Sequence, residues 1–167
     1  MIEIFRAGRQ LWKVRLWMWI SIILAVPAIW WGWDLFQTYG TRPADGGVLA
    51  SLPVRLAWGG TVAGLSLAFV YGMWLYGGLY VANMVYDERS DRLHVRTLSF
   101  LGNRDRVFSA ADVQGSSYHG GDFWAGGVAV NAPWVTVRMR GRRWPFIVDA
   151  QGEFPNRDLG RRLFGGR

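Results

Sequence analysis

The chain has 167 residues, of which 51% are hydrophobic, and it carries a formal net charge of +7. These two properties are compatible only if apolar and charged residues are segregated along the chain, and the sequence shows this segregation. Cysteine is absent, which excludes disulfides, zinc–thiolate sites and thiol catalysis.

Two long apolar stretches predict a transmembrane hairpin over residues 16–86. Leu16–Trp33 and Leu56–Tyr86 contain no charged residue, and a helix needs about 20 apolar residues to cross a hydrocarbon core. We expect helices over about residues 16–36 and 56–86. A buried helical hairpin of a soluble protein is the alternative, but the rest of the chain is too short to cover two such stretches.

The loop between the helices, residues 37–55, is rich in glycine and proline and contains only two basic residues, Arg42 and Arg55. In contrast, a basic leader over residues 1–15 precedes the first helix, and several arginines follow the second. The positive-inside rule therefore predicts that both termini are cytoplasmic. In a mitochondrion the equivalent side is the matrix.

Small residues recur along both helices. In lipid they let two helix backbones approach closely. They are Ser21, Ala25, Ala28 and Gly32 on the first helix, and Gly60, Gly64, Ala68 and Gly72 on the second. We expect these strips to hold the hairpin together. The alternative is that one strip receives a helix of another protein.

After Tyr86 the hydrophobic pattern alternates, which predicts a cytoplasmic β-rich domain over residues 87–167. The expected strands lie at Leu93–Leu101, Arg106–Ala110, Val113–His119, Gly127–Val130, Trp134–Arg140 and Trp144–Val148, with a turn at Gly102-Asn103. A short helix over Asn156–Phe164 should begin at the Asn156 cap and stop at Gly165. The fold class is therefore a membrane helical hairpin followed by a small, mostly antiparallel β-domain with a short C-terminal helix. The strand pattern of this domain suits a pleckstrin-homology-like sheet, as well as other small barrels.

No catalytic or cofactor site is predicted. His94 and His119 lie in separate predicted strands, without the spacing of metal ligands. Asp87, Glu88 and Asp91 cluster near the end of the second helix, but arginines interleave with them, which is typical of a charged junction. We expect no enzyme activity, no cofactor and no metal.

Arginine and tryptophan gather on one predicted hairpin of the domain. The residues are Arg138, Arg140, Arg142, Arg143, Trp134 and Trp144. We expect one continuous surface that contacts a protein partner or anionic lipid headgroups, because a membrane surface attracts arginine. The alternative is that both tryptophans are core residues and the arginines are solvated. We do not expect nucleic acid as a partner of a membrane-bound domain.

Two stretches resemble the Transmembrane protein 70 family, with its relatives numbered 186 and 223. One is Tyr86–Val113, with LHVRTLSFLGNR and FSAADV; the other is Phe146–Gly165, with FIVDAQGEFPNRDLGRRLFG. The resemblance covers most of residues 56–165. It implies an inner-membrane protein that helps to assemble respiratory complexes and that has no known catalytic residues.

The combined interpretation is a non-catalytic accessory or assembly subunit of a large energy-transducing inner-membrane complex, respiratory or photosynthetic. Its partners would be other subunits of that complex, together with membrane lipids. The alternative is a stand-alone lipid-binding module of the inner leaflet. Nearly all basic residues are arginine, which we interpret as the coding bias of a GC-rich, bacterial genome. We therefore expect a bacterial inner membrane; the alternative is the mitochondrial inner membrane.

Overall fold

The computed structural model describes residues 1–43, 47–125 and 128–164, with the backbone alone between residues 122 and 130. The expected order of two long apolar helices, antiparallel β-sheets and a short C-terminal helix is confirmed. The chain divides into two units, residues 16–74 and residues 1–15 with 75–167. Gly127 and Gly165, which were expected to start a strand and to stop the last helix, lie outside the described residues.

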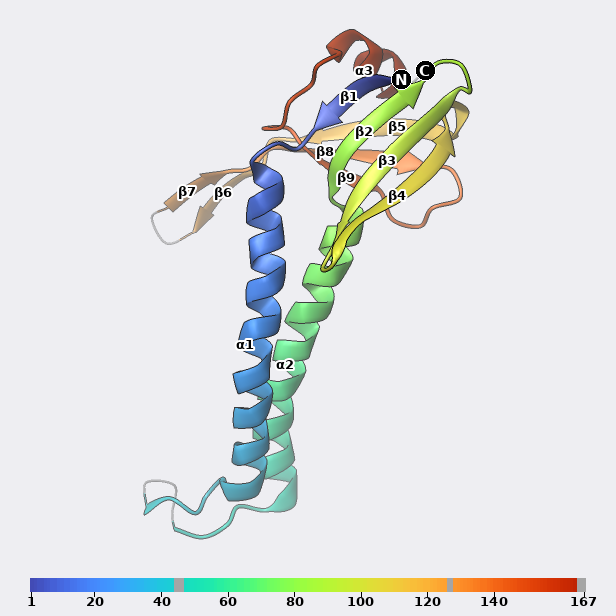
Figure 1. The fold of residues 1–167 in the computed structure, drawn as a ribbon. Coiled ribbons are helices and arrows are strands. Elements are labelled where there is room, and N and C mark those ends of the chain that lie inside the picture. The colour runs from blue at the N-terminus through green and yellow to red at the C-terminus, as the bar shows by residue number, and fades with distance from the viewer. Residues whose placement is uncertain (44–46, 126–127, 165–167) are drawn as a thin grey trace. The chain divides into compact units, whose positions relative to one another are not determined.

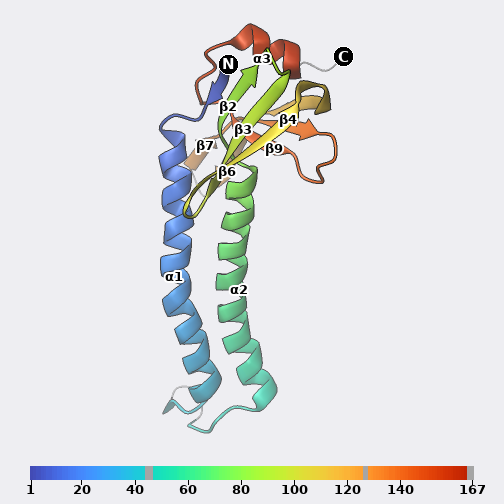
Figure 2. The same cartoon turned by 45° about the vertical axis from the view of Figure 1, so that its right-hand side comes forward.

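The hairpin consists of α1 (Gln10–Thr38) and α2 (Leu52–Leu79), which run side by side in opposite directions (Figure 1, Figure 2). Both helices are longer than needed to cross a membrane. The Arg55 guanidinium donates a hydrogen bond of 3.2 Å from Nη1 to the backbone oxygen of Phe36 and lies over its ring. This contact places a cation at the carbonyl end of α1, where the helix dipole favours it.

The second helix ends earlier than the sequence predicts. An apolar helix was expected to continue to Tyr86, but α2 ends at Leu79 and β2 (Val81–Asp87) follows at once. Val81 and Met84 are fully buried in the domain. A strand buried in this way is a short apolar stretch, and periodicity alone does not separate it from the end of a buried helix.

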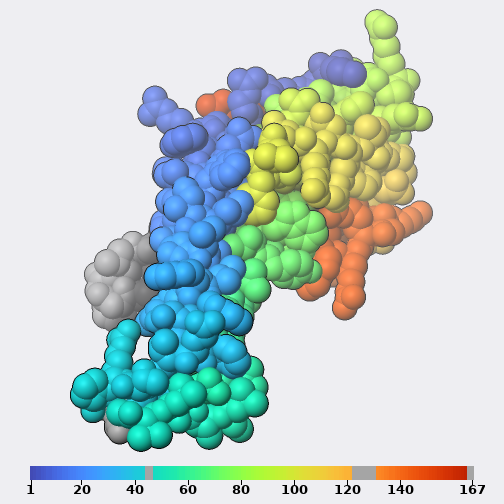
Figure 3. Space-filling model, turned by 60° about the horizontal axis from the view of Figure 1, so that its bottom comes forward, coloured from blue at the N-terminus to red at the C-terminus, as the bar shows by residue number. Residues whose placement is uncertain are grey.

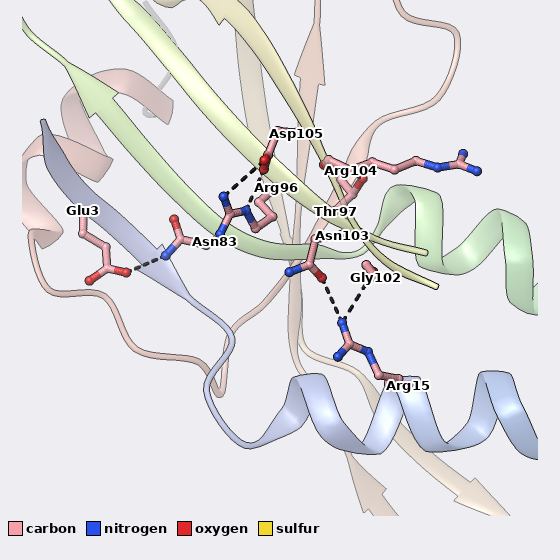
Figure 4. Close-up of polar contacts among 9 residues, drawn as sticks. All are labelled: Glu3, Arg15, Asn83, Arg96, Thr97, Gly102, Asn103, Arg104 and Asp105. Carbon is pink, nitrogen blue, oxygen red and sulfur yellow. Dashed lines mark hydrogen bonds and ion pairs between the residues drawn. The ribbon is translucent and has the colours of Figure 1, made fainter. Parts of the chain in front are cut away.

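The expected basic leader contains a strand, β1 (Ile2–Arg6), which pairs antiparallel with β2. Arg6 and Glu153 also exchange two backbone hydrogen bonds of 2.9 and 2.8 Å. Asn83 on β2 donates to the Glu3 carboxylate, and Arg15 reaches the β3–β4 turn (Figure 4). The segment before α1 is therefore an integral part of the β-domain.

The described residues of the domain form three antiparallel sheets, in the orders β1-β2-β3-β4, β5-β8-β9 and β6-β7. The remaining strands are β3 (Arg92–Ser99), β4 (Gly102–Ser109), β5 (Val113–His119), β6 (Asp122–Ala125), β7 (Val128–Asn131), β8 (Trp134–Met139) and β9 (Phe146–Asp149). The β3–β4 turn lies at Phe100-Leu101, two residues earlier than expected, because Ser99 pairs with Gly102. This register buries Leu98 and leaves Leu101 exposed at the tip of the turn.

The two larger sheets share one core. Its largest fully buried side chains come from β1, β2, β3, β8 and β9 and from Tyr80, and an isolated bridge joins Tyr80 to Ile147. A side chain at Gly152 would lie 2.5 Å from the Phe5 ring, so the chain passes β1 at a distance that only glycine allows. The last helix, α3 (Arg157–Phe164), begins as expected, with the Asn156 side chain accepting a hydrogen bond from the Leu159 amide.

Candidate functional site

The two helices of the hairpin approach closely at a pair of glycines. A Cβ at Gly32 would lie 2.7 Å from the carbonyl oxygen of Gly59 and 3.2 Å from Ala63, and a Cβ at Gly59 would collide with the carbonyl oxygen of Gly32. Neither position has room for a larger residue. The crossing of α1 and α2 is therefore built on backbone-to-backbone contact, as small residues allow in lipid.

The predicted strip on α1 faces this crossing. Ser21, Ala25 and Gly32 are buried, and Ala28 is half-buried. The Ser21 hydroxyl donates a hydrogen bond of 2.6 Å to the backbone oxygen of Met18, so its polar group is satisfied within the helix. These residues form the contact face of α1.

The predicted strip on α2 is placed differently. A Cβ added at Gly60, Gly64 or Gly72 would have no described atom within 4 Å, and Ala68 is exposed. The contact with α1 uses Gly59 and Ala63 instead. The strip of Gly60, Gly64, Ala68 and Gly72, which we name the outer strip, is left uncovered by the rest of the hairpin.

Many large apolar side chains of the hairpin are exposed. Large side chains such as Trp30, Leu65 and Tyr71 are more than half exposed, and Figure 3 shows the side chains of α1 projecting along one face of the hairpin. A groove of about 270 Å³ opens beside the glycine crossing, with Trp33 and Phe36 on one wall and Leu56 on the other. These features suit contact with lipid tails or with apolar helices rather than with water.

The predicted arginine and tryptophan cluster lies along the β8–β9 hairpin, but it does not form one continuous surface. Trp134 pairs with Asp149 at one end of the hairpin, and Trp144 lies in the connecting loop at the other end. Only Trp144, which is 51% exposed, accompanies the arginines. The hairpin separates the two tryptophans because its strands are extended between them.

The four arginines have two different environments. Arg138, Arg140 and Arg143 are exposed, and the Arg143 guanidinium lies 5.7 Å from the centre of the Trp144 ring. Arg142 is partly buried and lies 3.9 Å over the Phe146 ring. We name the three exposed arginines and Trp144 the basic patch; these are the side chains that a partner can reach.

Arg142 has a mainly structural environment. Its Nη1 atom is buried and has no hydrogen-bond partner among the described residues. Burial lowers the pKa of Arg142, and the charge of nearby Arg106 lowers it further. Its stacking on Phe146 is the contact that offsets this desolvation.

Trp134 belongs to another part of the surface. Its ring stacks on His119 at a centroid distance of 5.1 Å, and it also borders a cavity of about 440 Å³. The His119 ring lies 3.3 Å from the Thr136 hydroxyl. The described residues contain no group of three or more His, Asp or Glu side chains suited to a metal ion.

The acidic junction forms the β2–β3 turn. Asp87 accepts hydrogen bonds from the Ser90 hydroxyl and the Arg89 amide, and these bonds lower the pKa of its carboxyl group. The Tyr86 hydroxyl donates to Asp91 at 2.7 Å. The carboxylates are therefore used to fold a turn.

The sequence pattern does not identify two residues of α2 that contact α1, namely Gly59 and Ala63. They are spaced four apart, as are Gly60 and Gly64, so the sequence offers two adjacent strips of small residues. A single sequence has no signal that selects one of them. The choice depends on the rotation of α2 about its own axis.

The fold and these surfaces define a class: a hairpin of two membrane-capable helices joined to an antiparallel β-domain, an arrangement that fits a membrane protein. Residues 41–166 match the TMEM70/TMEM186/TMEM223 protein family. The match covers more than half of the chain, and the protein belongs to this family. No curated protein and no solved structure matches the chain at a significant level, so the pleckstrin-homology-like comparison stays a prediction.

Membership of this family is consistent with a membrane-associated assembly factor, and proteins of the family are not known enzymes. The match begins after α1, so it includes α2 and most of the β-domain but neither β1 nor α1. Thus β1, which completes the first sheet, lies outside the matched residues.

Proposed function

We propose that the protein is a non-catalytic accessory or assembly subunit of a large energy-transducing inner-membrane complex, respiratory or photosynthetic. The observation that carries this proposal is the uncovered outer strip on α2. In a hairpin that only had to hold itself together, such residues would face α1. Here Gly59 and Ala63 serve that purpose, and the outer strip is left for a second helix.

The β1–β2 pairing supports a hairpin that enters and leaves the membrane on one side. β1 precedes α1 and β2 follows α2, and the two strands are hydrogen-bonded in one sheet. We infer that the two ends of the hairpin lie on the same side of the membrane. The distribution of basic residues favours the cytoplasm of a bacterium, or the matrix of a mitochondrion, as that side.

The domain supplies the second contact of the proposed subunit. Arg138, Arg140, Arg143 and Trp144 are exposed, and the Arg143 guanidinium lies near the Trp144 ring. Arginine and tryptophan are the residues most often found as anchors of protein interfaces. We expect the basic patch to bind an acidic surface of a neighbouring subunit on the side of the membrane where the domain lies.

Co-purification tests this proposal. The tagged full chain would be purified from its own membranes in mild detergent, and the accompanying proteins identified. We expect a large membrane complex with the native chain and its loss with Gly64→Leu. The matched control, Leu65→Ala on the neighbouring exposed position, should keep the complex. An unchanged set of partners for Gly64→Leu would exclude the outer strip as an interface.

The alternative is a stand-alone lipid-binding module, for which the exposed charges of Arg138 and Arg140 are the supporting observation. The same experiment separates the two proposals. A lipid-binding module would purify without partner proteins, and its membrane association would depend on anionic lipid rather than on Gly64.

A further inference from the structure

A cavity of about 440 Å³ lies in the β-domain unit, next to the segments that connect to the hairpin. Its walls include Tyr76 in the last turn of α2, Tyr80 just after it, and Trp134 at the start of β8. Gln10, the first residue of α1, also lines it. The cavity is therefore bordered by the first residue of one apolar helix and the last turn of the other, and its volume is that of a small-molecule site.

The one acidic side chain among the described residues that line the cavity is Asp149. The Oδ2 atom of Asp149 accepts a hydrogen bond of 3.2 Å from the Tyr80 hydroxyl, and its Oδ1 atom accepts one of 2.8 Å from the backbone N–H of Gln151. Among the described residues that line the cavity, none is Lys or Arg, and no described residue forms an ion pair with Asp149. In a chain of net charge +7, this cavity is a local negative site.

The neighbouring groups keep Asp149 an acceptor. Burial, together with the Asp149 charge, raises the pKa of Tyr80, so the phenol stays protonated and continues to donate. The Tyr76 and Tyr80 rings are 5.7 Å apart, and the Trp134 ring is fixed by its stack on His119. Gln10 donates to Gln151, which in turn donates to the backbone oxygen of Asn131.

We propose that this cavity binds the primary ammonium group of a phospholipid headgroup, as in phosphatidylethanolamine. Aromatic faces attract a cation, and a carboxylate without a cationic partner accepts its N–H groups. A headgroup without a cationic amine, such as that of phosphatidylglycerol, would gain neither interaction. The proposal rests on the membrane placement argued above, since Gln10 and Tyr76 then lie near the level of the headgroups, where tyrosine and tryptophan are favoured.

The test uses the full chain in detergent, supplied with equal amounts of phosphatidylethanolamine, phosphatidylcholine and phosphatidylglycerol. The lipids that remain bound are counted by native mass spectrometry. We expect retention to decrease from phosphatidylethanolamine to phosphatidylcholine and then to phosphatidylglycerol. Asp149→Asn should reduce this preference about tenfold, because it removes the charge of a charge-assisted hydrogen bond. Asp105→Asn, an exposed carboxylate on β4, is the matched control and should leave the preference unchanged.

Thermal unfolding of each variant shows whether it is folded, and the lipid order of the native chain tests the proposal without any substitution. Equal or stronger retention of phosphatidylglycerol would overturn it, as would a preference that survives Asp149→Asn. If Asp149→Asn instead removed a protein partner and the native chain showed no lipid preference, the cavity would receive a lysine of that partner, and the lipid proposal would be wrong. Because Asp149→Asn should not alter co-purification, failure here is distinguishable from failure of the subunit proposal.

Discussion

The hairpin and the β-domain use apolar residues in opposite ways. In the domain, Phe5, Tyr80 and Phe146 are almost completely buried by the chain itself. In the most apolar windows of α1 and α2, only 17% and 6% of the residues are buried. The domain therefore covers its own apolar surface, whereas the hairpin leaves its surface to lipid or to another protein.

This difference shows where the chain depends on partners. The domain buries its own apolar core, so we expect its contacts with partners to use exposed groups such as the basic patch. The helices of the hairpin pack tightly at Gly32 and Gly59, and many of their other described side chains are exposed. A substitution in the core of the β-domain should therefore affect folding. A substitution at most exposed positions of the hairpin should affect association with partners.

The largest expected effect is on the domain, at a residue that precedes the hairpin. Phe5 on β1 is fully buried, and its ring centroid lies 5.1 Å from that of Phe154. Phe5→Ala should lower the free energy of unfolding of the domain by about 3–5 kcal/mol, through lost burial and a cavity. Denaturant unfolding of the full chain in detergent measures this. Leu101→Ala, at a turn position that is 92% exposed, is the control; equal effects would mean that β1 is not part of the core.

The next effect is at the glycine crossing of the hairpin. Gly59→Leu places a side chain against the backbone of Gly32, and it should destabilise the hairpin by about 1–3 kcal/mol through overpacking. Thermal unfolding in detergent compares it with Gly64→Leu. The latter substitution meets no described atom and should leave the unfolding midpoint unchanged while reducing association with partners. Similar midpoints for both variants would contradict the distinction between the two faces of α2.

A smaller effect is expected for the basic patch. Replacing Arg138, Arg140 and Arg143 together with Ala should weaken partner binding about tenfold and leave folding intact, because these side chains are exposed. Pull-down of the partner complex measures this. The same loss of charge on α3, by Arg157→Ala, Arg161→Ala and Arg162→Ala, is the control. If both triple variants lose binding equally, net charge rather than this patch attracts the partner.

The smallest effect concerns the exposed ion pair of Arg96 and Asp105. The guanidinium donates two hydrogen bonds, of 2.6 and 3.1 Å, to the carboxylate and lowers the pKa of Asp105. Because the folded-state pKa is lowered, the stabilisation is present above the ordinary aspartate pKa and is lost as pH falls through the lowered value. Asp105→Asn should cost less than about 1 kcal/mol near neutral pH. The difference in unfolding midpoint between native chain and variant should vanish in strong acid; a constant difference would assign the effect to something other than charge.

The parts of this structure that could be predicted are those with a local pattern. A pattern within one short stretch of sequence indicates each of them: the apolar helices, the alternating strands after Tyr86 and the Asn156 cap. In contrast, β1 contains Glu3 and Arg6 and becomes recognisable as a strand only through its pairing with β2. The early end of α2 has the same origin, since that pairing requires an extended chain after Leu79.

The candidate interaction residues show the same division. Small residues on both helices were found from their spacing, but the face of α2 that meets α1 depends on helix rotation, which no local pattern specifies. Trp134 and Trp144 were grouped because they are close in sequence, and the register of β8 and β9 places them at opposite ends. Residues from α1, α2, β8 and β9 line the cavity at Asp149. Because these elements are far apart in the sequence, no local pattern predicts the cavity.

The most direct test of a protein partner at the outer strip is photocrosslinking in native membranes. A photoreactive phenylalanine would replace Leu67, which is exposed one turn after Gly64, and, as control, Ile23, which is exposed on α1 away from its contact face. We expect an adduct with another membrane protein from Leu67 and lipid adducts alone from Ile23. Lipid adducts alone from both positions would contradict it.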